Sequence, residues 1–311
     1  MIKSKLKDLE DACQVKAIFL RSRLEKFGGR KGVVGLVRDA LKFQKAQDFQ
    51  KELDLLQPLV DFLEEVPYRS TKSVLYVCIS DEMEWSIYLQ KHPASLKRVV
   101  KNISEICPID NVLRQYGMAA WELGDYTTAT KVLKLAIKWN PASSSCRSLL
   151  AMVYMDQNRW NDAFKVTLEA LDTAYTPSSI GRCYRFIESY FEKKNKFEEC
   201  FYFCWFRTRF ANSNQDYKEI ADKLLFFYKK MRESQDIATE ETLLKTVRKY
   251  KIPLDINSNI LGIAVKRYQE ESLADNKGLA EYFSKILSDL QKCKTKGKNI
   301  SLKTNLGRYK N

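Results

Sequence analysis

The stretch DNVLRQYGMAAWELGDYTTAT, residues 110–130, decides the fold because its pattern of small, aromatic and apolar positions returns twice along the chain. The aligned copies begin at Asp110, Ser144 and Gly181, 34 and then 37 residues apart. Repetition at this spacing predicts a series of similar helical hairpins. An aromatic residue and, three positions later, a small one recur in each copy: Tyr126 with Ala129, Trp160 with Ala163, and Phe197 with Cys200.

The small residues have a physical reason. Two antiparallel helices that lie close together need small side chains where their backbones cross, with a large aromatic beside them to fill the turn. Gly117 and Ala151 supply the small side chain on the first helix of a pair, and Ala136 and Ala170 supply it on the second. The pattern therefore predicts paired antiparallel helices that bury a small-residue seam.

At these residues the chain resembles the tetratricopeptide repeat (TPR) family, and it is similar to bacterial TPR proteins of unassigned role. The copy from Gly117 to Pro141 matches best, with its small residue, aromatic, Gly-Asp-Tyr, alanine and closing proline. The third copy has Glu188 and Arg207 at two positions where the pattern has small residues. The resemblance implies an all-α, right-handed superhelical solenoid of antiparallel helix pairs, with no sheet.

We expect three regions: an N-terminal helical cap, residues 1–68; a TPR-like solenoid, residues 69–290; and a basic flexible tail, residues 291–311. Clear repeats span 110–143, 144–177 and 181–214, with degenerate pairs on both sides. The apolar run 74–79 fits a helix or a strand, and neighbouring helices favour a short helix. Further helices are expected at 2–27, 36–66 with a break near Pro58, 81–91, 94–107, 217–231, 240–250, 258–270 and 277–293.

The glycines between Gly28 and Gly35 suggest a phosphate-binding loop, but the Gly-Lys-Ser/Thr ending and a preceding strand are lacking. A helix end followed by a helix start explains them better. The basic N-terminal helix allows two readings, a cover for the open end of the solenoid or an amphipathic helix on an anionic membrane surface. The first is favoured, because a solenoid end needs such a cover.

The formal net charge of +14 lies at the chain ends. Residues 1–45 and residues 291–311 each carry a net charge of +7, which leaves residues 46–290 neutral. A nucleic-acid-binding solenoid is expected to carry a basic stripe along its repeats, and none is visible. Binding of RNA through the basic ends stays an alternative, although the tail offers only Tyr309 for base stacking.

The eight cysteines are scattered among apolar helical neighbours, which indicates reduced thiols and a cytoplasmic location. Cys200 and Cys204 lie one helical turn apart but lack a second Cys/His pair nearby, so we read them as small core residues. His92 is the sole histidine and precedes a proline, as a turn residue would. These observations predict neither catalytic residues, nor a metal, nor a cofactor, and the protein is expected not to be an enzyme.

The TPR resemblance implies that the inner wall of the superhelix binds the partner. We therefore predict a non-enzymatic protein–protein interaction scaffold whose concave groove holds a peptide segment of another protein. The alternative is that Trp121 and the methionines pack against a neighbouring repeat. A peptide-sensing regulator is a further alternative. The predicted groove residues are Asn111, Arg114, Met118, Trp121, Ser148, Met152, Met155, Arg182, Arg185 and Ser189.

Overall fold

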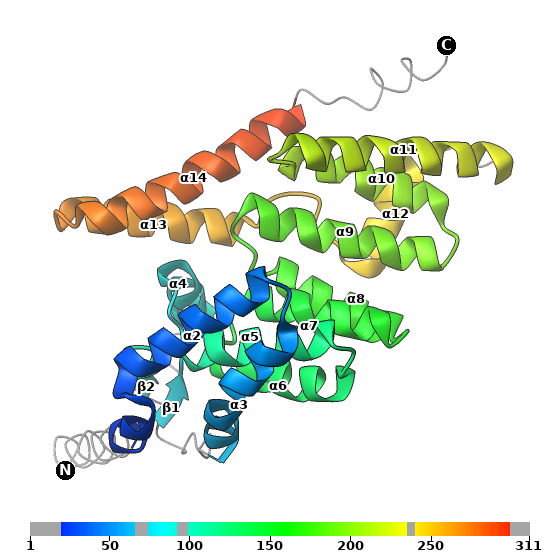
Figure 1. The fold of residues 1–311 in the computed structure, drawn as a ribbon. Helices are drawn as coiled ribbons and strands as arrows, with labels where there is room; N and C mark the ends of the chain where they lie inside the picture. The colour runs from blue at the N-terminus through cyan, green and yellow to red at the C-terminus, as the bar shows by residue number, and fades with distance from the viewer. Residues whose placement is uncertain (1–19, 66–73, 92–98, 235–239, 299–311) are drawn as a thin grey trace. The chain divides into compact units, whose positions relative to one another are not determined.

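A computed structural model describes residues 20–65, 74–91, 99–234 and 240–298 (Figure 1). The described chain is mostly helical, as predicted, and it divides into two compact units, Met1–Gln157 and Asn158–Asn311. The division falls inside the second predicted repeat. Among the described residues, every helix is too short or too polar to span a bilayer.

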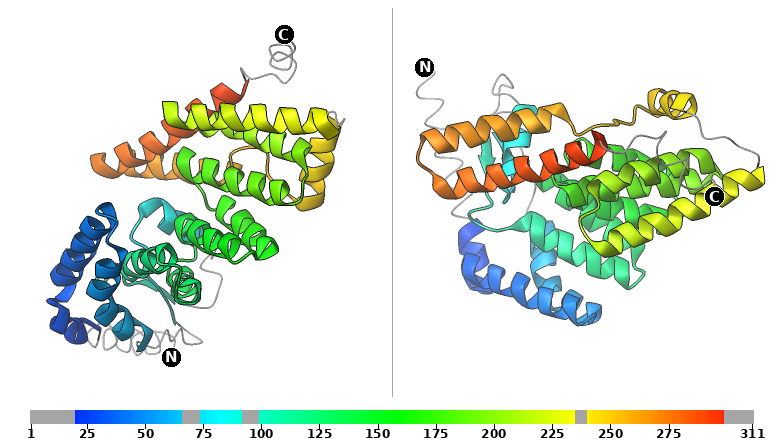
Figure 2. Two further views of the ribbon diagram at one scale, coloured as in Figure 1. Left: turned by 45° about the vertical axis from the view of Figure 1, so that its right-hand side comes forward. Right: turned by 90° about the horizontal axis from the view of Figure 1, so that it is seen from above.

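Unit 1 is built on helix hairpins that pack side by side (Figures 1 and 2). The α2–α3 hairpin packs on α5, the α5–α6 hairpin follows, and α6 packs on α7. Leu56, Leu59 and Leu113 are fully buried between these helices because they lie on the apolar stripes that face the neighbouring hairpin. The helices are α2 (Gly29–Lys45), α3 (Phe49–Glu65), α5 (Ile109–Glu122), α6 (Tyr126–Trp139) and α7 (Ser144–Asp156).

A two-stranded sheet in unit 1 contradicts the expectation of a fold without strands. β1 (Val74–Val77) pairs in parallel with β2 (Val99–Asn102), and α4 (Glu82–Lys91) lies between them in sequence. The prediction of a short helix at 74–79 is therefore wrong. The prediction of a helix at 94–107 is also wrong for residues 99–107, the part that the structure describes. The apolar run forms a strand because Val99 and Val100, far along the chain, supply backbone partners. The Asn102 side chain extends the pairing by exchanging two hydrogen bonds with the backbone of Ile79.

The N-terminal region also differs from the prediction. Pro58 lies inside α3 instead of breaking it. The chain turns earlier, at Gln47, whose φ of 57° is left-handed, and the Asp48 carboxylate accepts from the Lys51 N–H at the start of α3. The expected helix end at Gly28 is confirmed, because Gly28 has a φ of 75° and α2 starts at Gly29. Residues 1–19 of the predicted first helix lie outside the described residues.

Unit 2 continues with helix pairs. α8 packs on α9, α9 pairs with α10, α10 packs on α11, and α13 pairs with α14. The last helix runs to Lys298, so the first residues of the predicted flexible tail are helical instead. The elements are α8 (Trp160–Leu171), α9 (Pro177–Lys193), α10 (Phe197–Arg207), η2 (Thr208–Phe210), α11 (Asn214–Ser234), α12 (Glu240–Tyr250), α13 (Ser258–Leu273) and α14 (Lys277–Lys298).

Each aligned aromatic begins the second helix of its predicted repeat: Tyr126 starts α6, Trp160 starts α8 and Phe197 starts α10. The turn just before it holds a residue with positive φ, Gly124, Asn158 or Asn195, each two positions before the aromatic. Glycine and asparagine tolerate this left-handed conformation better than other residues. The recurrence in the sequence therefore corresponds to a recurring helix–turn–helix geometry.

Candidate functional site

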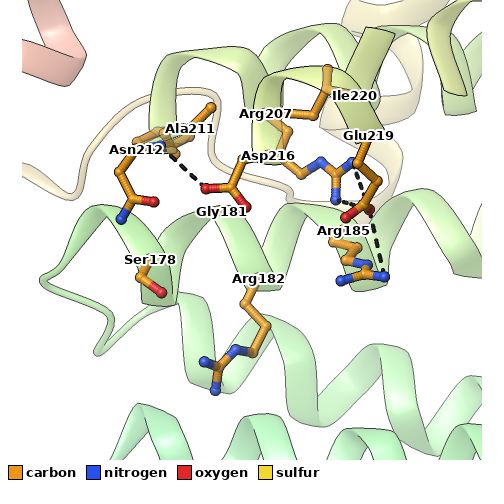
Figure 3. A pocket seen from close by; sticks show the side chains of 11 residues that line it. Ser178, Gly181, Arg182, Arg185, Arg207, Ala211, Asn212, Asp216, Glu219 and Ile220 are labelled. Atoms are coloured by element: carbon orange, nitrogen blue, oxygen red, sulfur yellow. Dashed lines mark hydrogen bonds and ion pairs between the residues drawn. The ribbon is translucent and has the colours of Figure 1, made fainter. Parts of the chain in front are cut away.

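The candidate site is a cavity of about 230 Å³ between α9 and α11, which we call the arginine pocket (Figure 3). All of its walls belong to unit 2. Arg182 and Arg185, two predicted groove residues, lie on its α9 side and are exposed. The lining residues are Ser178, Gly181, Arg182, Arg185, Arg207, Phe210, Ala211, Asn212, Asp216, Glu219 and Ile220.

Local sequence fixes the α9 wall. Thr176 and Ser179 exchange hydrogen bonds as a capping box, with Pro177 in the first turn, so α9 starts at a defined residue. One turn later Gly181 lets the connection after α10 approach closely, because a Cβ there would lie 3.2 Å from the Cβ of Phe210. The Phe210 ring stacks on Tyr184 at 5.5 Å and closes the apolar end of the pocket.

The α11 wall carries the acidic groups. Asp216 N–H donates to Ser213 Oγ at 3.1 Å, and Asp216 Oδ2 accepts from Asn212 N–H at 3.3 Å. A separate side-chain hydrogen bond between Ser213 and the Asp216 carboxyl group is the main reason that the pKa of Asp216 is lowered, so the carboxylate accepts at the start of α11 in its charged form. One turn on, Glu219 Oε1 pairs with Arg185 at 3.5 Å and with Arg207 at 3.3 Å (Figure 3).

Beneath the pocket, the two departures from the small-residue pattern lie against each other. Glu188 is fully buried, and its Oε2 is 3.7 Å from Nε of Arg207, which is 6% exposed. Lys223 of α11 completes the cluster by donating to Glu188 Oε1 at 2.6 Å. Burial raises the pKa of Glu188 despite both cations. An ion cluster therefore occupies the helix crossing that small residues fill elsewhere in the predicted repeats.

Charged side chains of α9 and α11 form ion pairs with each other at successive turns, but Arg182 does not take part. Glu219 holds Arg185, and Lys223 holds both Glu188 and Glu192. Arg182 points away from this network and has no hydrogen-bond or ion-pair partner among the described residues (Figure 3). A guanidinium presents five N–H donors in a fork suited to a carboxylate or a phosphate. The pocket is therefore lined by one arginine whose N–H donors are unused.

The C-terminal helix adds positive charge at the rim. Lys296 of α14 donates to the backbone oxygen of Ala211 at 3.0 Å and to the Tyr217 hydroxyl at 2.9 Å. Ala211 itself lines the arginine pocket. Lys292, one turn earlier on α14, pairs with Asp289 at 3.3 Å and is largely exposed. Part of the charge that the sequence assigns to the C-terminal end thus lies next to the pocket.

A second cavity, of about 210 Å³, lies in unit 1 and is called the carboxyl pocket here. Its α5 residues Asn111 and Arg114 precede Arg182 and Arg185 by 71 residues each, the offset between the first and third predicted repeats. The two cavities therefore use the same positions of the repeat. The carboxyl pocket is lined by Ser80, Asp81, Glu84, Asp110, Asn111, Arg114, Ser143, Ser145 and Cys146.

The α4 segment places acidic groups in the carboxyl pocket. Asp81 caps α4 by accepting from the backbone N–H groups of Met83 and Glu84, both at 2.9 Å. Asn140 Nδ2 donates to Glu84 Oε2 at 2.6 Å and to Asp110 Oδ2 at 2.9 Å. Burial is the main cause that raises the pKa of Glu84 to about 7, and it also raises the pKa of Asp110. In unit 1 the protein's own carboxyl groups occupy the surroundings of Arg114.

Unit 1 engages most of its predicted groove residues internally. Met118 Sδ accepts from Gln44 of α2 at 3.1 Å, and Trp121 Nε1–H donates to Asp156 at 2.6 Å. Ser148 is buried, while Met152 and Met155 are half-buried on α7. Asn111 and Arg114 line the carboxyl pocket. These contacts favour the packing alternative for this part of the predicted groove.

Unit 2 brings together Arg182 and Arg185, whereas Ser189 lies further along α9 and donates to the Arg185 backbone oxygen. Cys200 and Cys204 are fully buried, as predicted for core residues, and burial raises the pKa of both thiols. His92 lies outside the described residues. Within the described ranges no group of three or more His, Cys, Asp or Glu side chains is arranged to hold a metal ion.

Sequence reasoning missed the α11 wall. Asp216, Glu219 and Lys223 share one face of a helix, at spacings of three and four residues. Arg182, Arg185 and Glu188 share one face of α9 at spacings of three residues, with the opposite sign at each of the three positions. This complementary pattern was the available signal for the pairing of the two helices.

No protein-family model matches the chain, and no curated protein matches it.

Proposed function

We propose that this protein is a non-enzymatic, TPR-like scaffold that binds a peptide segment of another protein at the arginine pocket. Its stacked helix pairs would form a right-handed solenoid in which the first helices of successive pairs line the binding face. The observation that carries the proposal is the exposed, unpartnered guanidinium of Arg182 at a pocket that Phe210 and Ile220 also line. Peptide grooves combine polar anchors with apolar contacts.

A selection from a display library of short random peptides, carried out on the full-length protein, tests the function. We expect the wild type to enrich a defined set of peptides. The Arg182→Ala, Arg185→Ala double variant should lose at least tenfold in affinity for that set, because two of the three arginines that line the pocket, both of the exposed ones, are removed. Affinities would be measured by fluorescence anisotropy with synthetic copies of the enriched peptides.

The matched control is the Lys245→Ala, Arg248→Ala double variant, which removes two exposed cations from α12, neither of which lines the arginine pocket. It should bind as the wild type does. Circular dichroism should show unchanged helicity in both double variants. Failure of the wild type to enrich any peptide, or equal affinity in the Arg182→Ala, Arg185→Ala variant, would contradict the proposal.

A further inference from the structure

We infer that the ligand of the arginine pocket is an acidic peptide segment, one of whose carboxylates pairs with Arg182. This inference rests on the proposed function and specifies the chemistry of the partner. The shared chemistry is a carboxylate, which a segment can supply from an Asp or Glu side chain or from its C-terminus. The argument uses the arrangement of charges in both pockets.

The first step is that Arg182 has no carboxylate partner, whereas its neighbours on α9 form ion pairs with α11. Arg185 has Glu219, and Glu188 has Lys223, but Arg182 points away from α11, where Asp216 is used in the helix cap (Figure 3). Asp216 makes no ion pair with Arg182 in the described structure. An incoming carboxylate would take up the N–H donors that Arg182 leaves unused, with a bidentate hydrogen bond.

The second step is an internal precedent in unit 1. At the same repeat positions, the carboxyl pocket is lined by an acidic segment of the chain itself, with Asp81 capping α4 and Glu84 in its first turn. This segment lies beside Arg114, the residue 71 positions before Arg185. Unit 1 therefore shows an acidic polypeptide segment forming part of the wall of its cavity beside Arg114.

The third step is the extent of positive charge around the opening. Lys296 and Lys292 of α14 continue the cationic surface beyond the pocket, since Lys296 binds the backbone of Ala211. Cations at several points fit a segment with more than one carboxylate. Electrostatic attraction of this kind weakens as salt is added, because exposed charges are screened.

A peptide fits this surface better than a nucleic acid. Asp216 and Glu219 lie in the pocket wall, and Asp289 pairs with Lys292, so a continuous phosphate backbone would meet repulsion at three points. Base stacking needs free aromatic rings, and the exposed Tyr217 already holds Lys296 through its hydroxyl group. A peptide can place carboxylates only where the cations are.

The test compares peptides selected on the full-length wild type with those selected on Arg182→Glu and on the control Arg248→Glu. Wild type and control should enrich peptides rich in Asp and Glu above the starting library. Arg182→Glu should lose at least tenfold in affinity for these peptides. The peptides selected on Arg182→Glu itself should be richer in Lys and Arg. Amidation of the peptide C-terminus distinguishes the two carboxylate sources. If the amidated peptide still binds, the carboxylate comes from an Asp or Glu side chain. If binding is lost, the carboxylate is the C-terminus of the peptide.

Peptides that bind the wild type without acidic enrichment, or that bind Arg182→Glu equally well, would overturn the acidic ligand and leave the scaffold function standing. Absence of any enriched peptide would remove the scaffold function and this inference together. Single-stranded poly(U) RNA is the third probe. Tighter, Arg182-dependent binding of poly(U) than of any selected peptide would overturn the peptide ligand in favour of phosphate.

Discussion

The carboxyl pocket of unit 1 and the arginine pocket of unit 2 occupy the same positions of the predicted repeat and have opposite chemistry. The first has Glu84 and Asp110, 8% and 6% exposed, which share the amide of the buried Asn140. The second has exposed arginines on α9 and a guanidinium without a partner. The segment of β1 and α4 accounts for the difference in unit 1, because it contributes Ser80, Asp81 and Glu84 to the cavity wall.

The helix crossings near the two pockets also differ, because one is filled by small residues and the other by charged residues. Gly117 and Ala136 meet the small-residue rule in unit 1, whereas the corresponding Glu188 and Arg207 in unit 2 rely on charge compensation with Lys223. A repeat register thus fixes where a side chain lies, and the identity of the residue decides whether that position becomes core, ion cluster or binding surface.

The largest expected effect comes from removing the cation that holds Glu188. Lys223→Met keeps the length of the side chain but leaves the fully buried carboxylate of Glu188 with Arg207, at 3.7 Å, as its remaining cation in the cluster. We expect a loss of about 3 kcal/mol in the free energy of unfolding near neutral pH, measured by urea denaturation. Adding Glu188→Gln should recover most of it. A Lys223→Met variant as stable as the wild type would show that the cluster does not hold the crossing.

The stability of the protein should depend on pH through Glu84 of unit 1. Its pKa is about 7 when folded and 4.5 in the unfolded reference, so the folded state holds the proton more tightly. The resulting stabilisation is fully present below about pH 4.5 and is lost as the pH rises through about 7. Glu84→Gln should reduce this loss by roughly 1–3 kcal/mol, measured by urea denaturation at several pH values. An unchanged pH profile would contradict the assignment.

A methyl group at the crossing in unit 1 should have a smaller effect. In Gly117→Ala the new Cβ would lie 2.8 Å from Leu133 Cγ, which forces repacking, while the gain in helix propensity offsets part of the cost. We expect a net loss of about 1–2 kcal/mol in thermal or urea unfolding. The matched control is Gly262→Ala in α13, where no atom lies within 4 Å of the added Cβ and stability should rise slightly. Equal effects at the two glycines would refute close packing at the crossing.

The smallest effect concerns the competition inside the arginine pocket. Glu219→Gln removes the carboxylate shared by Arg185 and Arg207 and should raise affinity for acidic peptides by about two- to fivefold, in line with the weak energy of exposed pairs. Fluorescence anisotropy with a selected acidic peptide measures the change. Weaker binding by Glu219→Gln would mean that Glu219 positions the arginines instead of competing for them.

Much of the helical organisation could be predicted because it depends on local periodicity. The hairpins α5–α6 and α9–α10 and the separate helices α7 and α8 follow from positions spaced by one helical turn, and the later helices follow in the same way. The strand at Val74–Val77 could not be predicted, because a short apolar run takes its conformation from a partner, here Val99–Asn102. For the site, Arg182 and Arg185 were predicted as groove residues, while the α11 wall was missed.

By itself the sequence determined the helix pairs, their small-residue seams and the concentration of positive charge at the chain ends, since each depends on residue identity and on neighbours a turn away. Only the tertiary structure decided that Met118 and Trp121 pair within unit 1, that Glu188, Arg207 and Lys223 meet, and that Arg182 does not find an acid. These are contacts between distant residues. Their presence depends on how helices dock, which the period of any single helix does not specify.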